Sequence, residues 1–333
     1  MPDLSIPDVS GLDVIEDSIL KLSPSILRLL LQDKSTKRNI LWATKDYESL
    51  GEGYEEWSEI LPELITRENS MLIQPRSTKA KGEQTARTRD KAEVFTPCWV
   101  CNAQNNLVDN QWFDREGMFN TEKEHGWVTN PENITFAEKG AKTWKKYVDT
   151  KRLELTCGEA PYLVSRYDTV TGELIQVKDR IGLLDRKLRV VSENTKNEEA
   201  WFQWALRAYQ SVYGYEYQGD NLLLARENLL ATAIEYHQAL FGTDLTLKQL
   251  LRIANVICWN IWQMDGMKYV VPNSCRTETY EEFTLFGSVF REIPCPGCDK
   301  EMPLKHTGTY CKIFDWRKNK SLPFVSMLKG VQS

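Results

Sequence analysis

The chain has 333 residues, of which 41% are hydrophobic and 27% are charged, and its formal net charge is −5. This composition is typical of a globular protein with room for about two domains. There is no run of about 18 apolar residues, and no basic stretch followed by an apolar one at the N-terminus, so we expect a cytoplasmic protein with no membrane span. The acidic balance excludes a basic footprint over the whole molecule, so any nucleic-acid binding has to come from a local patch.

The first 73 residues are predicted to be a mostly helical region. Ser23-Pro24 is typical of a helix start, and apolar residues follow it at helical spacing. A further helix is predicted from Tyr54 to Ile65. The short apolar segment 39–44 between them favours a strand or a buried turn.

A basic linker, residues 74–90, follows this region. Between residues 74 and 91 there are six cationic and two acidic side chains, with few apolar ones. One interpretation is a solvated loop. The other is a segment that contacts DNA phosphates and releases their counterions. On that second interpretation the candidate DNA contacts are Arg76, Lys79, Lys81, Arg87 and Arg89.

Predicted strands alternate with predicted helices from residue 91 to residue 272. The sequence indicates strands at 152–156, 212–216 and 256–263, and helices at 198–213, 221–241 and 247–254. This alternation is the pattern of a doubly wound parallel sheet. It predicts an α/β fold.

Two of these predicted strands end at segments whose residues are suited to contact a bound ligand. After the first comes a tight turn, in which Gly158 and Ala160 let the backbone approach a bound molecule closely. Glu216 ends the second strand, where a carboxylate can accept both hydroxyls of a ribose. Ligands of doubly wound sheets bind outside the carboxyl ends of the strands, so the pair is a candidate nucleoside site. An ordinary turn and an ordinary strand end are the alternative.

The ordered segments around this pair resemble a known family. They are Phe95-Thr96-Pro97, the turn 156–163, Gly214-Tyr215-Glu216 and the helical segment 224–230. In this order they resemble the adenine-N6 DNA methyltransferases of restriction–modification systems, especially the modification subunits. That family has a Phe-Thr-Pro segment, an Asp-Pro-x-Cys-Gly-x-Gly-x-Phe-Leu turn, a Gly-x-Glu strand end and a Leu-Ala-x-x-Asn-Leu-Leu helix.

The resemblance covers residues 91–272 and implies a Rossmann-like domain that uses S-adenosylmethionine to methylate adenine N6 in DNA. Asp265 stands where the family's third strand ends in an aspartate that receives the adenine amino group of the cofactor. The implied partners are DNA and other restriction–modification subunits, with no membrane. By this match the residues lining the cofactor site are Phe95, Thr96, Pro97, Thr156, Gly158, Ala160, Glu216 and Asp265.

The chain also departs from the family pattern. Thr156 is read as standing in the place of the first acidic residue of the turn, and Ala160 replaces the second glycine. The family's Asn/Asp/Ser-Pro-Pro-Tyr/Phe segment, which polarises the adenine amino group and stacks on the flipped base, has no match. None of the 13 prolines adjoins another, and the closest segment is Ser321-Leu322-Pro323-Phe324, so no catalytic residue is assigned. The alternative function is therefore a non-catalytic DNA- or cofactor-binding subunit, and methylation of another substrate stays open.

The C-terminal residues 273–333 are predicted to form a small module with a metal site. Cys295, Cys298, His306 and Cys311 fall within 17 residues, and tetrahedral zinc suits such ligands. Unconnected reduced thiols are the alternative. The other pair, Cys98 and Cys101, is more typical of core thiols than of a redox motif.

Overall fold

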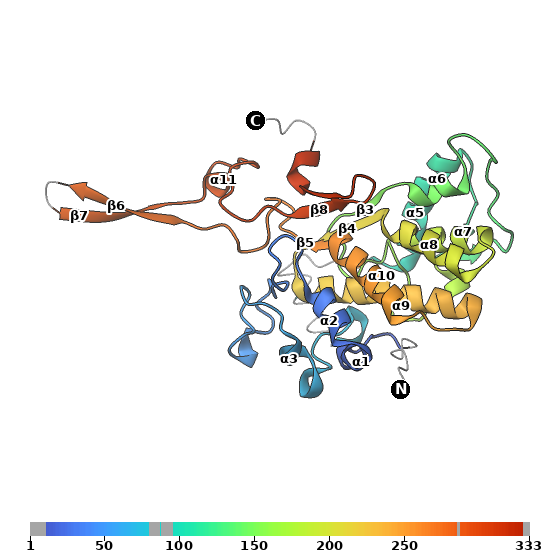
Figure 1. The fold of residues 1–333 in the computed structure, drawn as a ribbon, viewed down its shortest axis with the longest axis horizontal. Helices are drawn as coiled ribbons and strands as arrows, with labels where there is room; N and C mark the ends of the chain where they lie inside the picture. The colour runs from blue at the N-terminus through green and yellow to red at the C-terminus, as the bar shows by residue number, and fades with distance from the viewer. Residues whose placement is uncertain (1–10, 80–86, 88–95, 285–286, 329–333) are drawn as a thin grey trace.

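The fold is built on a small parallel sheet surrounded by helices, with one hairpin projecting from it (Figure 1). The computed structural model describes residues 11–79, 87, 96–284 and 287–328. Within them the sheet has the order β3 (Arg152–Glu154), β4 (Val212–Glu216), β5 (Ile261–Gln263), with both pairings parallel. The predicted α/β class is thereby confirmed at the level of a mixed fold with a parallel sheet.

Long helices connect these strands, and the last two of them pack on the sheet. The connecting helices are α7 (Leu183–Asn194), α8 (Glu198–Tyr209), α9 (Gly219–Phe241) and α10 (Leu247–Asn260). Thr246 and Gln249 form a reciprocal cap at the start of α10, and Gly242, with φ of 66°, ends α9 as its position predicts. The strand predicted at 256–263 is mostly wrong, because α10 continues through Asn260 and only Ile261–Gln263 is extended.

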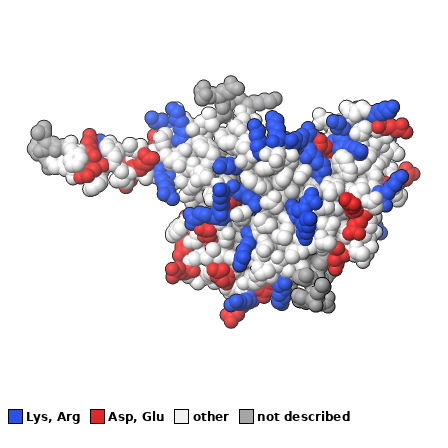
Figure 2. All heavy atoms as spheres, viewed as in Figure 1, with Lys and Arg blue, Asp and Glu red and all other residues white. Residues whose placement is uncertain are grey.

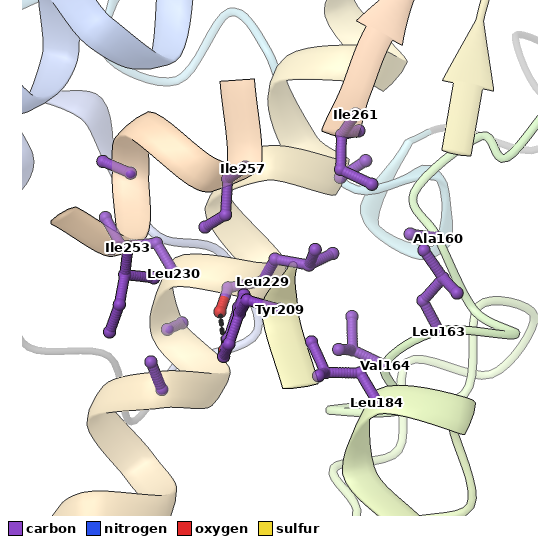
Figure 3. Packing of buried hydrophobic residues seen from close by; sticks show 14 of the residues in the cluster. Ala160, Leu163, Val164, Leu184, Tyr209, Leu229, Leu230, Ile253, Ile257 and Ile261 are labelled. Carbon is purple, nitrogen blue, oxygen red and sulfur yellow. Dashed lines mark hydrogen bonds between the residues drawn. The ribbon is translucent and has the colours of Figure 1, made fainter. Parts of the chain in front are cut away.

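The loop that follows β3 is anchored in the main hydrophobic core. Figure 3 shows Ala160, Leu163 and Val164 of this loop in the same cluster as Leu229 of α9 and Tyr209 of α8. The Tyr209 hydroxyl donates to the Leu229 carbonyl over 2.7 Å. Because its apolar side chains belong to the core, the loop is held at the end of the sheet.

The N-terminal region shares this core. The helix predicted after Ser23-Pro24 is confirmed as α2 (Pro24–Leu31), and α1 (Glu16–Leu22) precedes it. The Cys258 thiol of α10 donates to the Leu29 carbonyl over 2.7 Å. The helix predicted over 54–65 is wrong apart from α3 (Pro62–Ile65), and Trp57 is 62% exposed.

The remaining elements surround this body. They are the helices α5 (Cys98–Phe113) and α6 (Trp144–Asp149), the hairpin of β1 (Asn120–Lys123) and β2 (Gly126–Thr129), and the short turns η1 (Glu48–Leu50), η2 (Arg67–Asn69), η3 (Arg76–Thr78) and η4 (Val177–Asp179). Among the described helices, none combines the length and apolar character that a membrane crossing requires.

The C-terminal residues divide into two parts. The hairpin of β8 (Lys312–Asp315) and β9 (Lys320–Pro323), with η5 (Phe324–Met327), packs on the face of the sheet that carries Tyr213, Tyr215 and Trp262. The hairpin of β6 (Glu278–Thr284) and β7 (Gly287–Ile293) forms the projecting arm, and the one-turn helix α11 (Pro296–Asp299) follows it (Figure 1).

Candidate functional site

The loop after β3 reaches the end of β4. Three of its residues, Thr156, Gly158 and Ala160, have positive φ angles of 46°, 52° and 64°. The Gly158 N–H donates to the Glu216 carboxylate over 2.8 Å, and the Cys157 N–H donates to the Tyr215 carbonyl over 2.8 Å. The structure therefore brings the predicted turn and the predicted acidic strand end together.

The carboxylate of Glu216 is buried and held by backbone groups. Oε2 accepts from Gly158, while Oε1 accepts from the N–H groups of Tyr217 at 2.8 Å and Gln218 at 3.1 Å. Burial raises the pKa of Glu216, and these three donors partly offset the effect. Each carboxylate oxygen has two lone pairs, so Oε1 is fully used and one lone pair remains on Oε2.

Glu154, the last residue of β3, is a second buried carboxylate in the same place, and it is not among the predicted site residues. Its oxygens accept from the N–H groups of Tyr162 at 3.3 Å and Leu163 at 3.2 Å. Burial raises its pKa well above the usual value. The family turn has its acidic residue three positions before the cysteine, which is Glu154 in this chain. That spacing corrects the reading of Thr156, whose side chain is exposed.

Glu159 connects the loop to Arg76 of η3 and to Tyr167. Its Oε1 accepts from the Arg76 backbone N–H over 2.7 Å, and its Oε2 accepts from the Tyr167 hydroxyl over 2.7 Å. Three carboxylates, on Glu154, Glu159 and Glu216, thus hold a single loop.

Two of the three described candidate cations of the basic linker, Lys79 and Arg87, are buried in an internal ion-pair cluster. Arg87 is 2% exposed and donates to Asp220 and to Asp46, each over 2.8 Å. Lys79 Nζ lies 3.7 Å from Asp220, and its side chain is also buried. Burial alone would raise the pKa of Asp220, but these two cations hold it far below its usual value. This corrects the predicted DNA contacts at Lys79 and Arg87, because both cations pair with the buried carboxylate of Asp220.

Some of the other predicted residues lie beside this loop and strand end, and some fall outside the described residues. Asp265 follows Met264, whose N–H donates to the Glu216 carbonyl over 2.9 Å. Lys81, Arg89 and Phe95 fall outside the described residues. Thr96 and Pro97 lead into α5, and the Thr96 carbonyl accepts from the Thr169 hydroxyl over 3.1 Å. Asp265 closes its own turn after β5, accepting from the N–H groups of Met267 at 3.0 Å and Lys268 at 3.1 Å. Cys98 and Cys101 are buried free thiols, as predicted.

A second site forms at the base of the arm, where three thiols surround an imidazole. The ligand atoms of Cys275, Cys295, Cys298 and His306 all lie within 4.8 Å of one another, so the group can hold a metal ion. His306 Nδ1 is 3.6 Å from the sulfur of Cys275, 3.7 Å from that of Cys295 and 3.6 Å from that of Cys298. Tetrahedral coordination with bonds of about 2.3 Å to sulfur and about 2.05 Å to nitrogen separates these atoms by about 3.6 Å.

The backbone around this group is shaped to bring the ligands together. A Cβ atom at Gly297 would lie 2.5 Å from His306 Nδ1, and one at Gly308 would lie 3.0 Å from the Cys275 sulfur. The Thr307 N–H donates to the Cys295 sulfur over 3.2 Å. Only glycine lets the two chain segments approach this closely.

Cys311 is not a member of this group, which corrects the fourth predicted ligand. Its thiol is buried against the sheet and donates to the Gln263 carbonyl over 3.2 Å. Cys275 takes the fourth place. The β6–β7 hairpin carries the chain away and back, so that Cys275 and Cys295 meet at its base.

The segment closest to the family's catalytic motif lies in an antiparallel hairpin. Ser321 to Pro323 belong to β9, and Phe324 is buried against Tyr215 and Trp262. Comparison of the chain with protein-family models, curated proteins and solved structures found no match.

Proposed function

We propose that this chain is a methyltransferase-type subunit that binds S-adenosylmethionine and acts on adenine N6 in DNA, as the modification subunit of a restriction–modification system. The observation that supports it most is the 2.8 Å contact between Gly158 and Glu216. A tight loop and an acidic strand end on neighbouring parallel strands are where a Rossmann-like domain holds an adenosyl group. The order β3-β4-β5 puts both at the same edge of the sheet.

The polar groups at this edge suit such a cofactor, which would supply the methyl group when bound. Glu216 would accept the ribose hydroxyls, and the backbone of the turn at Gly158 would lie against the methionyl part. Because Gly158 already bonds Glu216, a ribose at this carboxylate would compete with that N–H. Glu154 and Glu159 would keep the rest of the loop in place during this exchange.

A second candidate function is a non-catalytic subunit that binds DNA or the cofactor. It is favoured by the position of Ser321 and Phe324, which lie in and beside an antiparallel hairpin rather than at the end of a parallel strand. Phe324 is packed against aromatic residues of the sheet, so its ring is not free to stack on a flipped base.

We propose that the metal held by the three cysteines and His306 is zinc, and that it has a structural role. Three thiolates and one imidazole form a closed tetrahedral set, which leaves no position for a reacting water. The site would hold the two ends of the β6–β7 arm together, because Cys275 precedes β6 and Cys295 follows β7.

Methylation-sensitive digestion of DNA tests the proposed activity. DNA is taken from cells carrying the gene alone, the gene with its neighbours, or a Glu216→Ala variant. The proposal predicts protection that the variant lacks. Protection that is absent in every combination, together with intact cofactor binding, would favour the non-catalytic candidate.

A further inference from the structure

A basic surface lies on elements outside the segment predicted to contact DNA. We define it by Lys145, Lys146, Lys151, Arg207, Arg317 and Lys318. Figure 2 shows lysine and arginine side chains gathered on this face, over the β8–β9 hairpin and toward α6. Arg152 also lines these hollows, and among the described residues only two carboxylates, Asp149 and Asp315, do so. Seven cations against two anions give a local net charge of +5.

Three adjoining hollows make the surface continuous. The first, of about 510 Å³, lies between α6 and α8 and includes Lys145, Lys146 and Arg207. A small cleft shares Arg207 with it and adds Lys151 and Arg317. The third, of about 420 Å³, shares Lys151 with that cleft and adds Lys318. The cations therefore follow a connected path over the molecule.

Both carboxylates on this path have partners within the chain. Asp149 pairs with both Arg207 and Arg317. Asp315 accepts the N–H groups of Arg317 at 3.0 Å and Lys318 at 3.1 Å, and these bonds, with the nearby lysines, lower its pKa. The four lysines of the surface make no ion pair with any described residue, and all are exposed.

Aromatic side chains accompany the lysines. Trp144 and Trp204 meet edge to face at 4.7 Å, and Lys145 Nζ lies 5.6 Å and 5.5 Å from their rings. Trp204 lines the first hollow. Grooves that bind single-stranded nucleic acid combine cations that follow the backbone with aromatic rings on which bases stack.

We propose that this basic surface binds the phosphate backbone of DNA. The choice of DNA as the polyanion rests on the proposed function, but the surface itself does not. Each lysine that neutralises a phosphate releases counterions, so binding must weaken as salt rises. The inference places the DNA on α6, the start of β3 and the β8–β9 turn, and not on the linker around Arg87.

Two triple variants with the same change of net charge test it by fluorescence anisotropy on a labelled duplex. The first is Lys146→Glu with Lys151→Glu and Lys318→Glu. The control is Lys123→Glu with Lys139→Glu and Lys196→Glu, three exposed lysines on other elements. The first should weaken binding about tenfold or more and lower the salt slope by about three, while the control changes affinity by less than about threefold.

Equal losses in the two triple variants, or no binding by the unaltered chain at low salt, would overturn the inference. Calorimetry with S-adenosylmethionine on the same proteins keeps the two proposals apart. If the cofactor does not bind but only the first triple variant loses DNA, the proposed function fails and the basic surface stands.

Discussion

The backbone N–H of Gly158 donates to Oε2 of Glu216 over 2.8 Å, and this bond fastens the loop after β3 to the end of β4. Glu154 and Glu159 hold the same loop through Leu163 and Arg76. The positive φ angles in the loop are strained for residues with a Cβ, and strain of this kind persists only where surrounding contacts impose it. The carboxylates supply those contacts.

The ion pair between Arg87 and Asp220 should be essential for stability. Asp220→Asn leaves the buried guanidinium without its fully buried carboxylate, and we expect a loss of about 3 kcal/mol in urea unfolding. Because the folded pKa of Asp220 is depressed, its contribution is present above the unfolded value of about 3.9 and is lost as pH falls below it. Asp46→Asn is the matched control, because Asp46 also pairs with Arg87 but its side chain is 29% exposed. A larger loss for Asp46→Asn would contradict the assignment.

The ligand set predicts that Cys275, and not Cys311, is needed to hold zinc. Cys275→Ser should lower the zinc that copurifies with the chain, measured by mass spectrometry of the metal. Cys311→Ser is the control, because its hydroxyl can replace the thiol as donor to Gln263 while the zinc stays. Loss of zinc in Cys311→Ser with retention in Cys275→Ser would restore the ligand set expected from the sequence.

Gly297 should be required for the same site without being a ligand. In Gly297→Ala the new methyl group would lie 2.5 Å from His306 Nδ1, so the imidazole has to move. We expect zinc affinity, measured by competition with a chromogenic chelator, to fall about tenfold or more. Gly126→Ala, where a Cβ meets nothing within 4 Å, should leave the affinity unchanged. Equal affinities for the two variants would argue against the observed approach of His306.

Two buried carboxyl groups should make the chain less stable at alkaline pH. Within the described part of the chain, neither Glu16 nor Glu227 has a hydrogen-bond partner for its carboxylate oxygens. Burial raises the pKa of each well above the usual value. A raised folded pKa means that the stabilising contribution is complete below the unfolded pKa of about 4.3 and is lost as pH rises. Glu227→Gln should therefore raise the melting temperature by about 3 °C or more at about pH 8 and have little effect at about pH 5.

The control for Glu227→Gln is Glu63→Gln, which changes an exposed carboxylate on α3. It should leave the melting temperature unchanged at both pH values. A Glu227→Gln variant that is destabilised at about pH 8 would show that the carboxylate is needed in its charged form.

The sequence predicted features that depend on local chemistry and missed those that depend on distant contacts. The turn at Gly158 and the strand ending in Glu216 are local patterns, and both are found. The apolar run 256–260 fits a strand or a buried helix equally well, and packing made it part of α10. The pairing of Arg87 with Asp220 joins residues 133 positions apart, which composition cannot reveal.

In the metal site, too, the ligands close together in sequence were predicted and the distant one was not. The spacing of Cys295, Cys298 and His306 was enough to predict three ligands. Cys275 could not be found that way, because a hairpin brings it back to Cys295. Cys311 lies at a plausible spacing, but β8 carries it to the sheet instead.

Titration calorimetry with S-adenosylmethionine tests the central claim most directly. The zinc-loaded chain and a Glu138→Gln control, altered at an exposed carboxylate, should give the same saturable heat, and Glu216→Gln should give none. No heat from the folded chain, or equal heats from the unaltered chain and Glu216→Gln, would contradict an adenosyl site at the ends of β3 and β4.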